Sequence, residues 1–505
     1  MQSIQIENLR SLEDTGRVEL KPITLLVGAN SSGKSTFLRT FPMLKQGLKY
    51  KTQGPILWYG PEVDFGNFET CLRDGAATMK FAFHWDKMLY TSIFSRVDNM
   101  YLTDIDYSIT LVPFEDDAYI KESMIRIGNH QLKFFYTPNN NRPIIEINGV
   151  SSEEYGKMGF NILNYGSKYV PVIFSHAAES EKIGEYDAST SMLVRCLQDI
   201  ACIQDKIGNL KNDFQSQIAL GTTQQVAESL LKLLESDVLV SALVNEPSFE
   251  KFVNILFLLQ IISITESVDT AFCADLENVH YIKPLRATAE RYYRQQNLAV
   301  NNLESDGHNM AMYVSNMYKS QKAKKSFQEW TSRTFGFVLE SHTQAGHVSL
   351  EIKDGRNEKS WNLTDKGFGY SQLLPVILKI WQFIGDISER RTRNPKDIII
   401  AIEQPELHLH PKLQSLLMNA FIEVAKDAWD SNVHIHFIIE THSQTMINRL
   451  GIKIAREEYK PEDAVVLLFC EDAQEGQPNP QRSEFNKDGF LMNWPVDFFD
   501  AEEMR

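Results

Sequence analysis

The sequence predicts an α/β fold that carries an antiparallel β lobe and a helical insertion. Three observations predict this class. An apolar strand at residues 23–27 leads through a loop of glycines and serines into a helix, and a second apolar strand at residues 397–403 ends in a carboxylate. Between them, apolar residues recur first at every second position and then at helical spacing. We therefore expect core strands with connecting helices, interrupted by an insertion.

The composition predicts a soluble protein of two or three domains. The 505 residues are 43% apolar and 23% charged, which is ordinary for globular proteins. The longest apolar run, residues 255–264, is about half of the ~20 residues that a membrane span needs, and no basic and then apolar leader opens the chain. The five scattered cysteines lack metal-ligand spacing and indicate reduced thiols, so we expect a cytoplasmic protein outside membranes. A net charge of −15 argues against wholesale coating of nucleic acid but permits a local basic stripe.

Residues 1–150 are expected to form the first half of the core together with the β lobe. Short strands are predicted at residues 4–7, 17–20 and 23–27, and the helix that starts at Lys34 is expected to run to about Leu48. From residue 78 to about residue 150 the pattern alternates, as in residues 79–83 and 107–111. This alternation predicts the antiparallel lobe.

Residues 151–275 are expected to form a mainly helical insertion. Apolar residues recur at helical intervals from residue 189 to residue 265, with Val226, Leu230, Leu233 and Leu234 on one face. We expect this face to be exposed and to dock a partner, because it has no part in the core chemistry. Residues 276–505 alternate strands and helices and are expected to complete the core.

The loop after the first core strand has the composition and spacing of a phosphate-binding loop. Because it joins a strand to a helix, it can present backbone N–H groups and a helix N-terminus to an anion. Lys34 can neutralise β- and γ-phosphate oxygens, and the Ser35 hydroxyl can complete a Mg²⁺ shell. We expect the chain to bind ATP and Mg²⁺ through Asn30, Ser31, Ser32, Gly33, Lys34, Ser35 and Thr36.

The strand at residues 397–403 ends in Glu403. If this strand lies next to the loop strand, Glu403 reaches the Mg²⁺ and its waters and is the metal-side acid. Gln404 and Glu406 follow where the chain leaves the sheet. One of these two residues must orient or deprotonate the attacking water, and Glu406 alone can act as a base.

Three of the histidines that follow these acids have candidate roles. His408 and His410 suggest either zinc or a structural role, and the lack of a third ligand at short spacing favours the structural role. His442 lies in Thr-His-Ser after an apolar strand at residues 436–440, which we expect beside the strand that ends at Glu403. A histidine at this edge can bond the γ-phosphate or the attacking water, so His442 is the predicted γ-phosphate sensor.

A glycine and serine segment precedes an apolar helix at residues 367–375. Gly369 and Ser371 are expected in an exposed loop that presents N–H groups and a hydroxyl to a phosphate. One side of the nucleotide is already covered by the chain's own phosphate loop. The expected ligand is therefore the ATP of a second protomer, and the alternative is a simple helix cap.

The order of these features resembles a known class of proteins. It resembles the ABC-type ATPases of the SMC, Rad-fifty and overcoming-lysogeny-defect (OLD) class, and most of all the stand-alone bacterial anti-phage ATPases of Septu-like and retron-associated systems. The resemblance is carried by I-E-Q-P-E-L-H-L-H-P at residues 402–411 and G-F-G-x-S-Q at residues 367–372. Residues 6–11, 281–286 and the tail at residues 486–499 also resemble that class. The resemblance covers roughly residues 1–75 and 280–505.

The resemblance implies an ABC-type P-loop ATPase head that forms a head-to-tail homodimer around two ATP molecules. Each site would combine Lys34, Ser35, Glu403 and His442 of one subunit with Gly369 and Ser371 of the other. The class usually has Asp at the position of Glu403 and a catalytic Glu at the position of Gln404. These departures predict slow hydrolysis or a switch that is governed by ATP occupancy.

The same resemblance suggests a biological role. OLD-type nucleases carry a further acidic domain after the Thr-His-Ser element, and we do not expect one in the 63 residues after His442. We expect control of a separate HNH-type nuclease. The alternatives are an SMC-like DNA repair or tethering ATPase and, third, a transporter ATPase. Lys319, Lys322, Lys324 and Lys325 are candidates for DNA or RNA contact, or form a solvated face.

Overall fold

The computed structural model describes the chain except residues 51, 53, 91–99, 139–142, 156–159, 163–168, 171–172, 176–191, 211–213, 296–299, 301, 355–358, 390–395, 432, 471–478 and 496–505. Part of the predicted insertion and the end of the predicted tail therefore lie outside the described residues. The chain divides into two compact units, and each is described by itself. Unit 1 consists of Met1–Glu19, Leu44–Gly60 and Asp64–Glu277, and unit 2 of Leu20–Met43, Pro61–Val63 and Asn278–Arg505.

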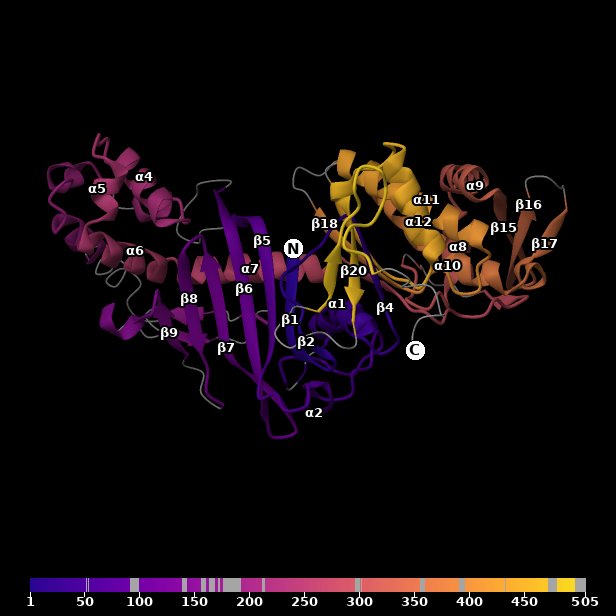
Figure 1. Cartoon of the computed structure of the whole chain (residues 1–505), viewed down its shortest axis with the longest axis horizontal. Helices are drawn as coiled ribbons and strands as arrows, with labels where there is room; N and C mark the ends of the chain where they lie inside the picture. The colour runs from indigo at the N-terminus through magenta and orange to yellow at the C-terminus, as the bar shows by residue number, and fades with distance from the viewer. Residues whose placement is uncertain are drawn as a thin grey trace. The chain divides into compact units, whose positions relative to one another are not determined.

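Unit 1 is built on an antiparallel sheet with the strand order β10-β9-β8-β7-β6-β5-β1-β2, in which β3 also pairs with β1 (Figure 1). Buried and exposed residues alternate along its strands, as the sequence pattern predicts, and the antiparallel lobe is confirmed. The strands are β1 (Ser3–Leu9), β2 (Leu12–Asp14), β3 (Val18–Glu19), β5 (Met79–Tyr90), β6 (Met100–Phe114), β7 (Asp117–Ile127), β8 (His130–Phe135), β9 (Ile144–Ile147) and β10 (Val150–Ser151). A separate pair consists of β11 (Phe160–Ile162) and β12 (Ile173–Ser175).

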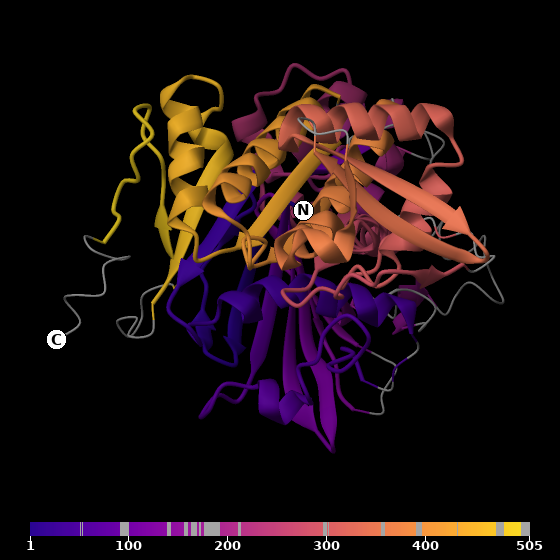
Figure 2. The same cartoon turned by 90° about the vertical axis from the view of Figure 1, so that its right-hand side faces the viewer.

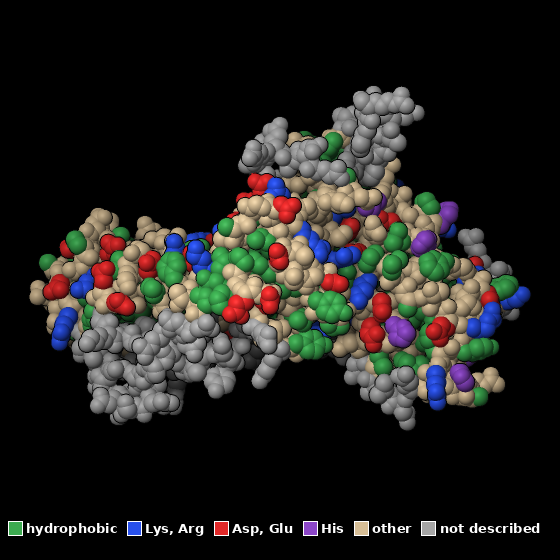
Figure 3. Space-filling view, turned by 90° about the horizontal axis from the view of Figure 1, so that it is seen from below, with side chains coloured by type: hydrophobic (Ala, Val, Ile, Leu, Met, Phe, Trp, Pro, Cys, Tyr) green, Lys and Arg blue, Asp and Glu red, His purple; other side chains and the backbone are tan. Residues whose placement is uncertain are grey.

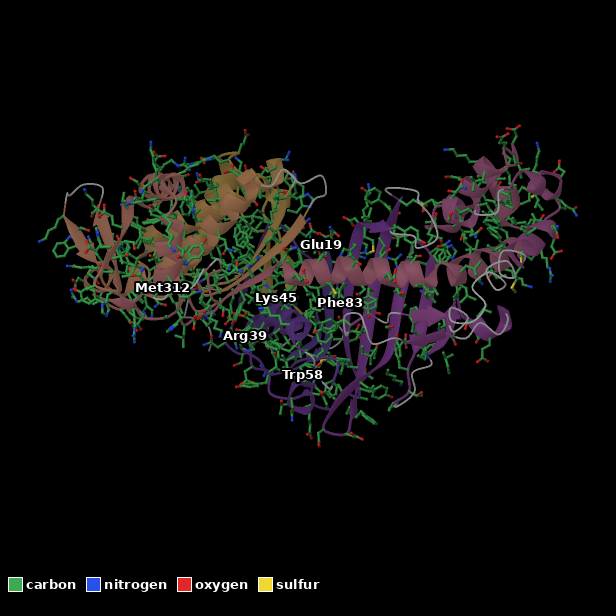
Figure 4. All side chains as sticks on the ribbon, turned by 180° about the vertical axis from the view of Figure 1, so that it is seen from behind. Glu19, Arg39, Lys45, Trp58, Phe83 and Met312 are labelled. Carbon is green, nitrogen blue, oxygen red and sulfur yellow. The ribbon has the colours of Figure 1, made fainter. Side chains whose placement is uncertain are left out.

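Helix α7 packs against this sheet. The Phe83 ring of β5 lies 4.7 Å from the Phe272 ring of α7, and Figure 4 labels Phe83 beside that helix. The Trp85 indole nitrogen donates to Asp275 Oδ2 at 2.7 Å. The helices of unit 1 are α2 (Phe68–Cys71), α4 (Thr223–Leu233), α5 (Val240–Val244), α6 (Pro247–Leu259) and α7 (Ile261–Glu277).

The predicted helical insertion does not carry an exposed apolar stripe along α4. Val226, Leu230 and Leu234 are completely buried, and Leu233 is partly buried. The expectation was wrong because α4, α5 and α6 pack on one another and cover the apolar face that the spacing identifies. Leu239, before α5, is exposed.

Among the described residues, no single helix is long and apolar enough to cross a membrane. The pair α6 and α7 meets the requirements of length and composition only when both helices are taken together, and the pair is bent by 57°.

Unit 2 contains the second main sheet, in the strand order β13-β18-β19-β4-β20-β21. All neighbours are parallel except β20 and β21. Figure 2 shows yellow β20 beside indigo β4 at one side of this sheet. The strands are β4 (Ile23–Gly28), β13 (Val279–Ile282), β18 (Lys396–Glu403), β19 (Val433–Glu440), β20 (Ala464–Phe469) and β21 (Gln481–Ser483).

This order confirms the α/β class and corrects one expectation. β18, which ends at Glu403, does not lie next to β4, because β19 lies between them. The strand at residues 436–440 does lie beside β18, as expected. Hydrophobic runs identify buried strands but do not give their order in the sheet.

Helices pack around this sheet and a smaller one. The Phe421 ring of α11 lies 5.0 Å from the Phe437 ring of β19, deep in the core. The smaller sheet has the order β14-β16-β15, and β17 pairs with β16. These elements are β14 (Tyr293–Arg294), β15 (Phe337–Gln344), β16 (His347–Asp354), β17 (Ser360–Asn362), α8 (Met310–Met317), α9 (Gln321–Phe335), α10 (Phe368–Glu389), α11 (Pro411–Asp430) and α12 (Gln444–Ala455), with α1 (Lys34–Lys49) crossing the boundary between the units.

Candidate nucleotide-binding site

The loop between β4 and α1 has the tight backbone of an anion-binding turn. Ser31 and Gly33 have φ of 64° and 106°. A Cβ on Gly28 would lie 2.3 Å from the Phe469 carbonyl oxygen, so only glycine permits β20 to approach here. Left-handed residues beside right-handed ones let successive N–H groups converge on an anion. The local geometry suits a phosphate.

Lys34 lies inside this loop. Its side chain is buried, and its ammonium donates to the Gly28 carbonyl oxygen at 3.0 Å and to the Ala29 carbonyl oxygen. The Ser32 hydroxyl also donates to the Ala29 carbonyl, at 2.9 Å. A buried cation is thus held by backbone carbonyls at the start of a helix, where an anion is favoured.

Ser35 meets an acid that the sequence interpretation did not single out. Its hydroxyl lies 2.9 and 2.7 Å from the two carboxylate oxygens of Glu440, the last residue of β19. Burial raises the pKa of Glu440, and the hydrogen bond from Ser35 opposes this shift. The signal was available, because residues 436–440 are also an apolar strand that ends in a carboxylate. What was missing was the strand order.

Glu403 is held by two other residues. Arg39 donates to its two carboxylate oxygens from Nε and Nη2, both at 2.6 Å, and the Tyr281 hydroxyl donates to Oε1 at 2.6 Å. Glu403 is buried, and its hydrogen bond raises the pKa of Arg39. Burial, and then the Glu403 charge, raise the pKa of Tyr281. Figure 4 labels Arg39, which the sequence interpretation also missed although it lies one helical turn after Ser35.

Arg286 fastens the turn after Glu403. Its Nη2 donates to the Glu403 carbonyl oxygen at 2.9 Å and to the Gln404 carbonyl oxygen at 3.3 Å, and Nη1 donates to the Gln372 carbonyl oxygen at 3.4 Å. Burial lowers the pKa of Arg286 to about 10. The Gln404 N–H donates to the Glu440 carbonyl oxygen at 2.8 Å, so the ends of β18 and β19 are fixed together.

Gln404, Glu406 and His442 line one cavity of about 400 Å³. Glu406 is 9% exposed, and its Oε1 accepts from the His442 N–H at 2.7 Å. Its Oε2 is buried and has no hydrogen-bond partner within the part of the chain that the structure describes. Burial raises the pKa of Glu406. Glu406 thus lines the cavity and has one carboxylate oxygen without a hydrogen bond and a raised pKa, which are features of a proton acceptor.

The His442 side chain is exposed at this cavity. Desolvation, and then the charge of Lys34, lower the pKa of His442 below 6.5. The ring is therefore neutral near pH 7 and can donate or accept one hydrogen bond at each nitrogen according to its tautomer. The structure thus brings His442 together with Gln404 and Glu406.

The predicted exposed loop around Ser371 is not present. Ser371 lies in the first turn of α10 and is 3% exposed, and its hydroxyl donates to the Phe368 carbonyl oxygen at 2.7 Å. The expectation was wrong because the helix begins at Phe368, directly after Gly367, and the serine bonds back to its own turn. The Ser371 hydroxyl is therefore not turned toward an outside ligand in this structure.

Gly369 and the two histidines have packing roles. A Cβ on Gly369 would lie 2.8 Å from the His408 carbonyl oxygen, so glycine permits a close approach of the two turns. The rings of Phe368 and His408 meet edge to face at 4.7 Å. His410 accepts from the Lys412 N–H at 3.2 Å and caps α11.

The residues of this site fit ATP and Mg²⁺ chemically. The loop supplies a cation and N–H groups for phosphates, and the hydroxyl of Ser35 and the carboxylate of Glu440 are hard oxygen donors of the kind that Mg²⁺ prefers. When bound, Mg²⁺ would neutralise charge on the β- and γ-phosphates.

Comparison with known proteins defines the class. Residues 1–144 and 150–447 match AAA_15, the AAA ATPase domain, and the chain belongs to this family. It is an ATPase by family. It is similar to endonuclease GajA of Bacillus cereus (strain HuB5-5), with 30% identity over 96 residues. That match covers 18% of this chain and only 14% of GajA.

Solved structures with similarity to this chain include an SMC head bound to the C-winged helix domain of ScpA. Its TM-score is 0.31, with 9% identity over 97% of this chain and 96% of that one. The SMC head domain from Thermotoga maritima has a TM-score of 0.29 and 9% identity over 92% and 94% of the two chains. The recombination mediator RecF with ATP has a TM-score of 0.26 and 11% identity over 95% and 98%.

Proposed function

We propose that this chain binds ATP with Mg²⁺, hydrolyses it slowly, dimerises around it and controls a separate effector nuclease in anti-phage defence. The observation that carries the ATP part is Lys34, buried in a tight loop at the start of α1 with the Ser35 hydroxyl beside it. The nuclease part is supported by the resemblance of residues 402–411 to defence ATPases and by the similarity to an endonuclease.

The predicted site residues of the phosphate loop and of the two strand ends have the following roles in this proposal. Phosphates are held by loop residues Asn30 to Thr36. Mg²⁺ is held by Ser35 with an acid at the sheet edge, and the sequence predicts Glu403 for this role. Glu406 deprotonates the attacking water and His442 contacts the γ-phosphate. Hydrolysis is slow because Gln404, where the resembling ATPases have a glutamate, cannot take up a proton.

Lys34→Ala should weaken ATP binding. Removing a charge-assisted contact to phosphate costs about 1.5–3 kcal/mol, which corresponds to roughly 10- to 150-fold in affinity. Titration of a fluorescent ATP analogue with purified wild type and variant measures this loss. Lys49→Ala, at the exposed far end of α1, is the matched control and should bind normally. Equal affinity of Lys34→Ala and wild type would contradict the ATP site.

Mg²⁺-ATP should convert the monomer into a dimer through the start of α10. Gly369 and Ser371 lie there, and the neighbouring Phe368 side chain is 47% exposed. Phe368→Asp would place an unpaired charge at that interface, which costs about 2–5 kcal/mol and lowers dimer affinity by ~30-fold or more. Sedimentation equilibrium with and without ATP measures the mass. Leu239→Asp, which changes an exposed leucine of unit 1, is the control and should dimerise like the wild type. If Phe368→Asp also dimerises with the affinity of the wild type, the start of α10 is not part of the dimer interface.

The basic cluster at the start of α9 should bind nucleic acid. Lys322 and Lys325 are exposed, and Lys324 is partly exposed. Lys325 lies 3.8 Å from the Glu329 carboxylate, and a further anion would stabilise the cations at this helix start. On the face that Figure 3 shows, seen from below, basic and acidic side chains are intermixed, so charge of one sign does not dominate that face.

Replacing Lys322, Lys324 and Lys325 with Glu should abolish binding of DNA or RNA and spare ATP binding. If each lysine neutralises one phosphate of a duplex, these three residues contribute about 2 to 3 to the slope of log affinity against log salt in the wild type. A salt series by fluorescence anisotropy measures this slope. Identical curves for variant and wild type would leave these lysines as a solvated face, while tight DNA binding without any nuclease partner would favour the alternative of a DNA repair or tethering ATPase.

A further inference from the structure

Two neighbouring parallel strands of the unit 2 sheet end in glutamates at matching register positions. Glu403 of β18 pairs with Glu440 of β19, and Glu440 in turn pairs with Leu26 of β4. Neighbouring strands are about 4.8 Å apart, so the backbone of Glu440 is one strand spacing from the loop strand and that of Glu403 is two. Both acids reach the edge where the phosphate loop begins, and Glu440 is the nearer.

The partners of the two carboxylates differ. The carboxylate of Glu440 accepts hydrogen bonds from the Ser35 hydroxyl, at 2.9 and 2.7 Å, and burial raises its pKa while the charges of Lys34 and Arg39 act on it and lower its pKa. Glu403 is bonded by the guanidinium of Arg39 at both oxygens, and by Tyr281. Its charge is compensated and its lone pairs are largely occupied. A cation could bind both oxygens of Glu403 only by displacing Arg39, which would leave the partly buried guanidinium of Arg39 without its partner.

We infer that Glu440, and not Glu403, is the acid that holds Mg²⁺ together with Ser35. Arg39 and Glu403 then form a fixed pair that supports the end of β18. The Gln404 N–H, bonded to the Glu440 carbonyl oxygen, holds the two strand ends in register. This inference rests on the proposed binding of ATP with Mg²⁺. It assigns the role of metal ligand to the last residue of β19 rather than to the last residue of β18.

The test is the effect of Mg²⁺ on ATP affinity, measured without turnover. Wild type, Glu440→Gln and Glu403→Gln are titrated with a fluorescent, non-hydrolysable ATP analogue, once in Mg²⁺ and once in EDTA. Groups that support a metal typically contribute 10- to 100-fold to its affinity. Glu440→Gln should lose about 10-fold or more of the enhancement by Mg²⁺ and keep its affinity in EDTA. Glu403→Gln should keep the enhancement.

Two further measurements separate a metal role from a folding defect. Thermal melting in EDTA checks that each variant is folded, and affinity in EDTA checks that the loop is intact.

Ser35→Ala combined with Glu440→Gln should lose no more enhancement than either change alone, since both act on one cation. With Glu403→Gln in place of Glu440→Gln, the double variant should behave like Ser35→Ala.

The outcomes are distinct. Loss of the enhancement in Glu403→Gln with retention in Glu440→Gln would overturn the inference and return the metal to Glu403. Equal enhancement in all three proteins would overturn it too. If wild type binds no ATP in either condition, the proposed function fails and this inference fails with it. If the Glu440→Gln variant does not fold, Ser35→Ala without any loss of enhancement would still overturn the inference.

Discussion

Glu406→Gln should lower the rate of ATP hydrolysis by roughly 100- to 10,000-fold, the usual contribution of a general base. The reason is geometric. One oxygen of Glu406 is fixed by the His442 N–H at 2.7 Å, and the other is buried at the cavity that Gln404 and His442 also line. A glutamine oxygen can still accept from His442, so the variant removes the base and preserves the anchor. Single-turnover release of phosphate at saturating ATP measures the effect.

The pH dependence follows from the raised pKa of Glu406. A base must be ionised, so hydrolysis should fall as the pH drops through a value above the usual 4.5 of this carboxyl. Gln404→Ala is the matched control, because it changes the same cavity without removing an ionisable group. If Gln404→Ala stops phosphate release and Glu406→Gln does not, the assignment of the base is wrong.

Much of the fold could be predicted because the local signals were strong. The run at residues 23–27, the glycines of the loop and Lys34 together specify a strand, a tight turn and a helix start, and the structure has β4 and α1 at those places. The β lobe follows from alternation that matches the pleat of a strand facing a core on one side. These features depend on residues close in the sequence.

The features that could not be predicted depend on partners far apart in the sequence. Arg39 meets Glu403 across 364 positions, and Ser35 meets Glu440 across 405. Neither pair can be identified until the order of β18, β19 and β4 is known. The burial of Leu230 also depends on distant residues. Its spacing correctly predicts a helix, but the spacing does not show that other helices cover this face. The prediction of an exposed loop at Ser371 was wrong for a local reason, because glycines before a helix do not determine at which residue the helix begins.

Arg39→Ala should be strongly destabilising, by about 3–5 kcal/mol in the free energy of unfolding, because it leaves the buried carboxylate of Glu403 without its cation. Tyr281 alone cannot compensate that charge, since a neutral hydroxyl supplies one hydrogen bond. Urea unfolding monitored for the transition of unit 2 measures the change. Ligand is left out, so the result reports the pair and not nucleotide binding.

Two variants in the same unit isolate the cause. Arg482→Ala removes an exposed pair with Glu484, 2.7 Å apart, and should cost less than about 1 kcal/mol. Arg39→Ala combined with Glu403→Gln should recover part of the lost stability, because no buried charge then remains unpaired. If Arg39→Ala were no more destabilising than Arg482→Ala, Glu403 would not depend on Arg39, and the reason for assigning Mg²⁺ to Glu440 rather than to Glu403 would lose half of its support.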